Sequence, residues 1–134
     1  MTTRTILPAC LAAFAILAGC TTTDLVNIEN RPVPVNLDGG THTVGDVQRA
    51  IIAACKRRGW TPVMDGDARV RCSISLRGRH EAEVLIPYSE SSFSILHASS
   101  SGLDYNERRQ TIHRNYNRWV ANLAQAIVQE MGRH

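Results

Sequence analysis

ARVRCSISLRGRHEAEVLIPY, residues 68–88, is the stretch that decides the fold of this 134-residue chain. On either side of Gly78, apolar side chains alternate with polar ones, which is the period of a half-buried β-strand. The expected turn has three residues, Gly78, Arg79 and His80. It pairs Leu76 with Ala82 and places the apolar side chains of both strands on one face. The segment predicts an antiparallel hairpin, with His80 as a turn residue or cross-strand partner and not as a catalyst.

Further strands are predicted on both sides of this hairpin. A short strand covers residues 60–64, and a third strand covers residues 92–99. Phe93 shares a face with Tyr88 only if residues 89–92 contain a bulge or an irregular loop. The expected sheet is an antiparallel meander of three to four strands.

Two amphipathic helices flank these strands. The first follows Thr43, which forms a capping box with Asp46, and Gly59 supplies its left-handed stop. The second ends at Gly132, and its apolar stripe comprises Ile112, Tyr116, Trp119, Val120, Leu123 and Ile127. The sequence therefore predicts a single two-layer α+β domain over residues 44–134, with both helices packed on one face of the sheet.

The N-terminus has the layout of a secretory signal peptide over residues 1–19. Arg4 precedes an uncharged, mostly apolar run that extends from Ile6 to Gly19. This run is shorter than the roughly 20 residues that a membrane-spanning helix needs. A retained membrane span is the alternative, and the length of the run speaks against it.

The residues Leu17, Ala18, Gly19 and Cys20 resemble the lipobox of bacterial lipoproteins. This resemblance implies that Cys20 is lipidated on its thiol, that cleavage occurs just before it, and that the new amino terminus is acylated. Thr21 in place of Asp implies the periplasmic face of the outer membrane, so the membrane is a partner through the anchor. The alternative is that Cys20 is a core thiol in a helix that stays attached.

Residues 20–43 are expected to be a lipidated N-terminus followed by an extended tether. The segment contains Pro32, Pro34, Gly39 and Gly40 and shows no sustained helical period. In its middle, residues 31–37 alternate in a way that also fits an edge strand along the domain.

The mature domain resembles a group of small uncharacterised proteobacterial lipoproteins. The resemblance is carried above all by IHRNYNRWVANL, residues 112–123, together with Trp60, Arg77, His80 and Tyr88 and the SSGLDY segment. It implies no activity. His97 departs from the pattern, because an aromatic strand residue is usual at that position.

Charge and motif content exclude several classes of function. The 15 basic and 12 acidic side chains are interspersed, so no nucleic-acid partner is expected. The chain has no G-x-S-x-G elbow, and its histidines lack the spacing of a metal site. We expect neither an enzyme nor a metal or other cofactor.

The polar side of the last helix is the candidate binding face. It comprises His113, Arg114, Asn117 and Arg118, beside Tyr116 and Trp119. Arginine and amphipathic aromatic side chains favour contact with an envelope protein or ligand. The alternative is that Asn115 and Asn117 bind loop backbone and that the aromatic side chains belong to the core.

Two functions stay open on this basis. The first is a non-catalytic binding or assembly module of the cell envelope. The second is a sequestering or carrier module for an acyl or glycan ligand, which requires a cavity between helices and sheet. A cavity lined by Tyr88, His97 and Trp119 would favour the second function, and a filled core would favour the first.

The remaining cysteines are Cys55 and Cys72. Cys10 leaves with the signal peptide and Cys20 is consumed by lipid, so these two are left together in an oxidising compartment. Both are expected to point into the layer between helix and sheet. They either form a disulfide that closes a loop of about 17 residues or remain free as small core side chains.

Overall fold

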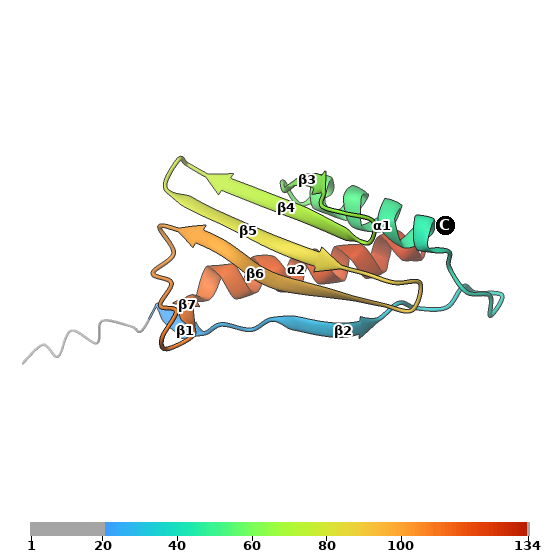
Figure 1. Cartoon of the computed structure of the whole chain (residues 1–134), viewed down its shortest axis with the longest axis horizontal. Helices are drawn as coiled ribbons and strands as arrows, with labels where there is room; N and C mark the ends of the chain where they lie inside the picture. The colour runs from blue at the N-terminus through green and yellow to red at the C-terminus, as the bar shows by residue number, and fades with distance from the viewer. Residues whose placement is uncertain (1–20, 134) are drawn as a thin grey trace, which may run out of the picture.

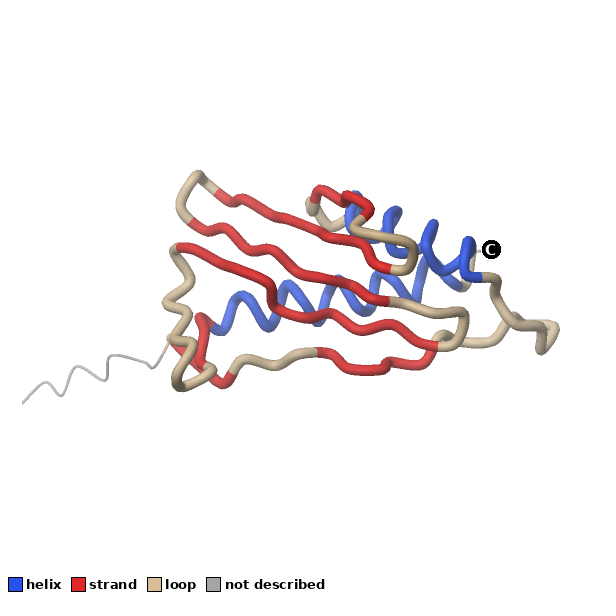
Figure 2. Tube along the Cα trace, in the orientation of Figure 1, coloured by secondary structure: helices blue, strands red, loops and turns tan. Residues whose placement is uncertain are grey.

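The hairpin lies at the centre of a five-stranded antiparallel sheet in the computed structural model, which describes residues 21–133 (Figures 1 and 2). The strand order is β2 (Ile28–Pro32), β6 (Ser92–Ser101), β5 (His80–Pro87), β4 (Arg69–Leu76) and β3 (Thr61–Met64). A separate two-stranded sheet pairs β1 (Thr22–Asp24) with β7 (Thr111–His113). The predicted α+β class is confirmed, and the sheet is larger than predicted.

The turn of the β4–β5 hairpin lies one residue earlier than predicted. Leu76 pairs with His80 and Ile74 pairs with Ala82, so the predicted register is wrong by two residues. Arg77 and Gly78 both adopt left-handed backbone, with φ of 55° and 64°. Because side chains alternate with period two, this even shift keeps the same apolar side chains on the inner face.

The third predicted strand, β6, contains one register shift and follows a tight turn. The Ser89 N–H donates to the Ser92 carbonyl at 2.8 Å, and Tyr88 then lies opposite Phe93 with both side chains buried. Farther along, Val84 pairs with His97 while Glu83 pairs with Ser99. The irregular loop at 89–92 is confirmed, and the bulge lies later in the strand.

Helices α1 (Val44–Arg57) and α2 (Arg114–Met131) cover the same face of the five-stranded sheet (Figure 1). Both halves of the Thr43–Asp46 capping box form, and Gly59 ends α1 with φ of 82°. Ile112 lies in β7 and not in the second helix as predicted, because its backbone pairs with Thr23. The largest fully buried side chains include Ile51, Ile86, Phe93, Ile95, Ile112, Tyr116, Leu123 and Ile127.

The N-terminal segment belongs to the domain and is not a long tether. Residues 22–24 and 28–32 form strands β1 and β2, so the boundary predicted at residue 44 is too late. The edge strand lies at Ile28–Pro32, earlier than the predicted 31–37. These strands gain their partners from segments far along the chain, which local composition does not reveal. Cys20 and the predicted signal peptide lie outside the described residues.

A disulfide joins Cys55 of α1 to Cys72 of β4. The two Cα atoms are 6.6 Å apart, and both side chains are fully buried. This geometry lies within the usual range for a disulfide. The predicted bridge is confirmed, and it fastens the end of α1 to the sheet.

Candidate functional site

The predicted helix face is largely taken up by structural contacts. His113 is the N-cap of α2, and its Nδ1 accepts a hydrogen bond from the Asn115 N–H at 3.1 Å. The Asn117 side chain accepts from the Val26 N–H at 3.1 Å and donates to the Asp24 carbonyl at 2.8 Å. The alternative interpretation, that Asn115 and Asn117 bind loop backbone, is confirmed for Asn117 alone, because the Asn115 side chain makes no hydrogen bond to residues 21–133.

The aromatic side chains of this face belong to the core. Tyr116 is fully buried, and Trp119 is half-buried against the core. Burial and the neighbouring Tyr105 raise the pKa of the Tyr116 hydroxyl. Of the six predicted face residues, Arg114 and Arg118 alone are exposed. The structure therefore does not assemble these six residues into one binding surface.

The layer between the helices and the sheet holds the hydrophobic core. Neither of the two pockets described within residues 21–133 is lined by Tyr88, His97 or Trp119. One pocket, of about 620 Å³, lies between residues 34–38 and the end of α2. The other lies on the sheet face that carries no helix.

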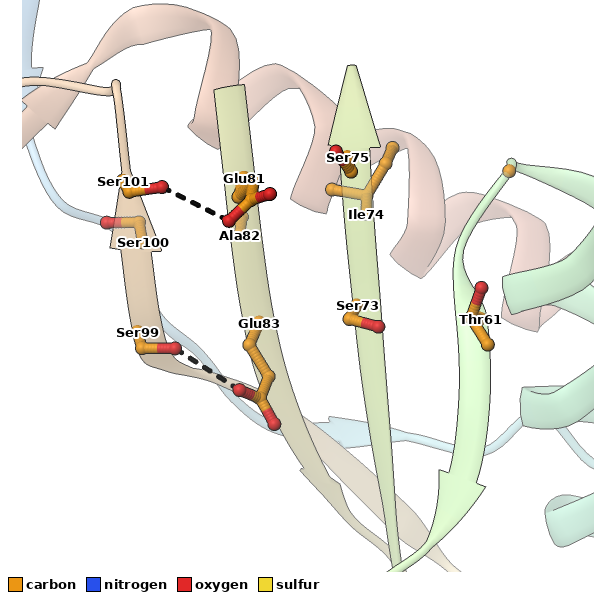
Figure 3. Close-up of a pocket in the computed structure, with 11 residues that line it drawn as sticks. Thr61, Ser73, Ile74, Ser75, Glu81, Ala82, Glu83, Ser99, Ser100 and Ser101 are labelled. Atoms are coloured by element: carbon orange, nitrogen blue, oxygen red, sulfur yellow. Dashed lines mark hydrogen bonds between the residues drawn. The ribbon is translucent and has the colours of Figure 1, made fainter. Parts of the chain in front are cut away.

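That open face carries a polar hollow of about 540 Å³, which we call the serine–glutamate trough (Figure 3). Its polar residues are Thr61, Ser73, Ser75, Glu81, Glu83, Ser99, Ser100 and Ser101. The Ser100 hydroxyl contacts His97 Nε2 at 2.9 Å, and the strand registers arrange the other seven in two rows. One row crosses β3 to β6 as Thr61, Ser73, Glu83 and Ser99, and the other crosses β4 to β6 as Ser75, Glu81 and Ser101.

The two glutamates of the trough have different partners. Glu83 accepts from Arg71 at 2.6 Å and from Ser99 at 3.2 Å. Arg71 also donates to Asp65 at 2.8 Å, and this hydrogen bond is the main cause of the lowered pKa of the Asp65 carboxyl.

Glu81 accepts from Ser101 at 3.3 Å and forms no ion pair with any residue from 21 to 133. Its carboxylate is available to a ligand.

Sequence reasoning missed this site. The serines of β6 were visible as a Ser-rich tract, but the trough requires the outward positions of four strands to meet. The available signal was the alternation of serine and glutamate with apolar residues in each strand. That alternation marks a solvent face, and it gives no sign of a hollow.

The chemistry of the trough is that of hydrogen bonding. Short hydroxyl side chains surround one ion-paired and one unpaired carboxylate, so the surface both donates and accepts. Within the described part of the chain, no group of three or more His, Cys, Asp or Glu side chains is placed to hold a metal ion. None of the helices formed by residues 21–133 has the length and apolarity to cross a membrane.

Comparison with known proteins returned no match for this chain. No family model, curated protein or solved structure matches it.

Proposed function

We propose that this chain is a lipoprotein held at the periplasmic face of the outer membrane by lipid on Cys20. Residues 1–19 act as its signal peptide. Residues 17–20, which resemble a lipobox, support this proposal, as does the uncharged, mostly apolar run that precedes Cys20. Two or three acyl chains hold a protein on a membrane far more firmly than one chain does.

The domain acts as a non-catalytic binding module, and the serine–glutamate trough is its binding face. The observation that supports this role is the one-sided packing of the two helices (Figure 1). Their packing leaves the other sheet face open, where two rows of polar side chains run across neighbouring strands. A ligand lying across the strands would meet both rows at once.

The lining favours a ligand rich in hydroxyl or amine groups, such as an envelope glycan. Serine and threonine hydroxyls exchange hydrogen bonds with sugar hydroxyls, and the free Glu81 carboxylate accepts from hydroxyl or ammonium groups. The acyl form of the carrier alternative has less support, because that ligand requires an apolar cavity. Neither pocket described within residues 21–133 lies between helices and sheet: the trough is on the open sheet face, and the other pocket is lined by residues 34–38 and the end of α2.

Intact-mass measurement on the membrane fraction tests the anchor. The expected mass is that of residues 20–134 with attached acyl chains. Cys20→Ala should accumulate as an uncleaved precursor. A soluble, full-length product from the wild-type gene would overturn the anchor proposal.

Cosedimentation with purified peptidoglycan tests the binding face. Ser75→Trp places an indole in the trough, and we expect at least about a tenfold loss of binding, as for a central interface residue. Gln125→Trp is the matched control, because Gln125 is exposed on α2 and lies away from the open sheet face. Equal binding by the two variants, or no binding by the wild type, contradicts the assignment of the trough to this glycan.

A further inference from the structure

The end of the domain at which Thr21 lies is built from three segments that contact one another. They are the β4–β5 turn, the connection between β6 and β7, and β1 with the residue after it, which lie together in Figure 1. His80 Nδ1 lies 2.8 Å from the Gly102 carbonyl, which joins the first two segments. The Leu25 N–H donates to the Gln110 carbonyl at 2.8 Å, which joins the second to the third.

Only one residue separates the proposed anchor from ordered structure. Thr21 follows Cys20 directly, and its carbonyl accepts a hydrogen bond from the Arg114 N–H at 2.8 Å. Strand β1 begins at the next residue. Since one extended residue spans at most about 3.6 Å, a lipid on Cys20 holds this end of the domain close to the bilayer.

The same end carries a cluster of exposed arginines, which we call the basic end. It comprises Arg77, Arg79, Arg108, Arg109 and Arg114. None of the five forms an ion pair with any residue that the structure describes. The acidic side chains of these segments are Asp24, Asp104 and Glu107, so with Arg114 at the start of α2 this end carries five positive and three negative charges. Glu81, the second residue of β5, is the next carboxylate after the turn.

Most arginines elsewhere in the domain are used differently. Ion pairs to Asp or Glu occupy Arg49, Arg57, Arg69, Arg71 and Arg133, whereas the scattered Arg31, Arg58 and Arg118 form none within residues 21–133. What distinguishes the basic end is that five arginines without an ion pair lie at one end of the domain. The guanidinium groups of the basic end are therefore available to an external anion. Guanidinium groups bind phosphate through two parallel hydrogen bonds, and an anionic bilayer presents phosphate at its surface.

We propose that the basic end lies on the headgroups of anionic phospholipids in the membrane that holds the anchor. This inference rests on the proposed lipidation of Cys20. Within a Debye length of about 8 Å, the attraction between arginine and the anionic surface is only partly screened. The lipid chains hold the domain at the membrane, and the arginines fix its orientation.

This orientation has a consequence for the serine–glutamate trough. The long strands run away from the basic end (Figure 1). Docking through that end stands the strands upright on the membrane. The open sheet face then points sideways into the periplasm, with the row of Ser75, Glu81 and Ser101 nearer the headgroups than the row of Ser73, Glu83 and Ser99.

The test uses the lipidated full-length protein in nanodiscs of phosphatidylcholine, with or without phosphatidylglycerol. Trypsin cleavage after Arg77, Arg79, Arg108 and Arg109 is followed by mass spectrometry, and cleavage after Arg58 serves as the internal reference. We expect the ratio of basic-end to reference cleavage to fall about fivefold or more in the anionic nanodiscs. High salt should restore the ratio.

A pair of variants separates arginine contact from mere proximity to the bilayer. Arg77→Gln with Arg79→Gln should raise cleavage after Arg108 in anionic nanodiscs. Lys56→Gln with Arg58→Gln is the control, because it removes two exposed charges near the end of α1. Cleavage after Arg108 should not change in this variant. Arg133 is the reference site here, since Arg58 has been substituted.

The two proposals fail in different ways. If the protein carries no lipid and does not associate with the nanodiscs, both the anchor and the docked orientation are wrong. If the protein is lipidated but the cleavage ratio is the same in both lipids, the anchor stands and the docking of the basic end is overturned.

Discussion

The Asn117 side chain donates a hydrogen bond to the Asp24 carbonyl, 93 positions earlier in the chain, at 2.8 Å. The same amide group accepts from the Val26 N–H at 3.1 Å. One side chain in the first turns of α2 thereby fixes the main chain between β1 and β2. Asn117 is a structural contact for the segment that follows the proposed anchor, and not part of a binding face.

Asn117→Ala should lower the free energy of unfolding by about 1–3 kcal/mol, because two main-chain groups lose their partner. Asn122→Ala is the control, since Asn122 is half-buried on the same helix and its side chain makes no hydrogen bond within residues 21–133. Urea unfolding measures both variants. Hydrogen exchange should also show that the Val26 amide exchanges faster in Asn117→Ala but not in Asn122→Ala. Equal losses of stability and equal exchange rates in the two variants would contradict a structural role for the Asn117 contacts.

Loss of the Cys55–Cys72 disulfide should destabilise the domain by about 3 kcal/mol, because a closed loop of this length restricts the unfolded chain. Urea unfolding with and without reductant measures the difference. The double variant Cys55→Ala with Cys72→Ala serves as the control and should not respond to reductant. Thiol counting on the denatured mature protein should find none, and two reactive thiols per molecule would refute the bridge.

Gly102→Ala should destabilise the domain by several kcal/mol. A Cβ at this position would overlap the Arg79 carbonyl oxygen, and Gly102 has φ of 70°. Gly66→Ala separates the two causes, because Gly66 also has positive φ, at 87°, but has open space around it. The control should lose only about 1 kcal/mol, the cost of left-handed backbone for alanine. Thermal melting compares the two, and similar losses would show that backbone strain alone explains the effect.

The stability of the domain should fall with pH below about 6.5 through His97. Burial lowers the pKa of His97 from its ordinary value of 6.5. As the pH falls below 6.5, the His97 side chain of the unfolded chain takes up a proton before that of the folded chain does. The free energy of unfolding therefore falls with pH, and it levels off at the lower value once the pH is below the folded pKa. The contribution is fully present above pH 6.5.

His97→Phe should remove this dependence while keeping a ring next to Tyr105 and Tyr116. Urea midpoints between pH 8 and pH 5, for wild type and variant, measure the change. Parallel loss of stability in the two proteins would assign the effect to other groups.

Much of the local structure was predictable because its causes are local. The capping box of Thr43 with Asp46 and the stop at Gly59 form as the sequence indicates. The hairpin strands also form, although their turn lies one residue early. Turn position depends on which residues accept positive φ, and here Arg77 does so beside Gly78. Alternation alone does not resolve that choice.

The sequence by itself determined the elements with a strong period: both helices, the hairpin, and the inward direction of Cys55 and Cys72. Only the tertiary structure decided the pairing of β1 with β7 and of β2 with β6, and the assembly of the trough and the basic end. The physical reason is range. Periodicity and capping depend on residues within a few positions of one another. The strand pairings, the trough and the basic end depend on contacts between segments far apart in the sequence, and the pattern of one segment does not indicate which other segment it will contact.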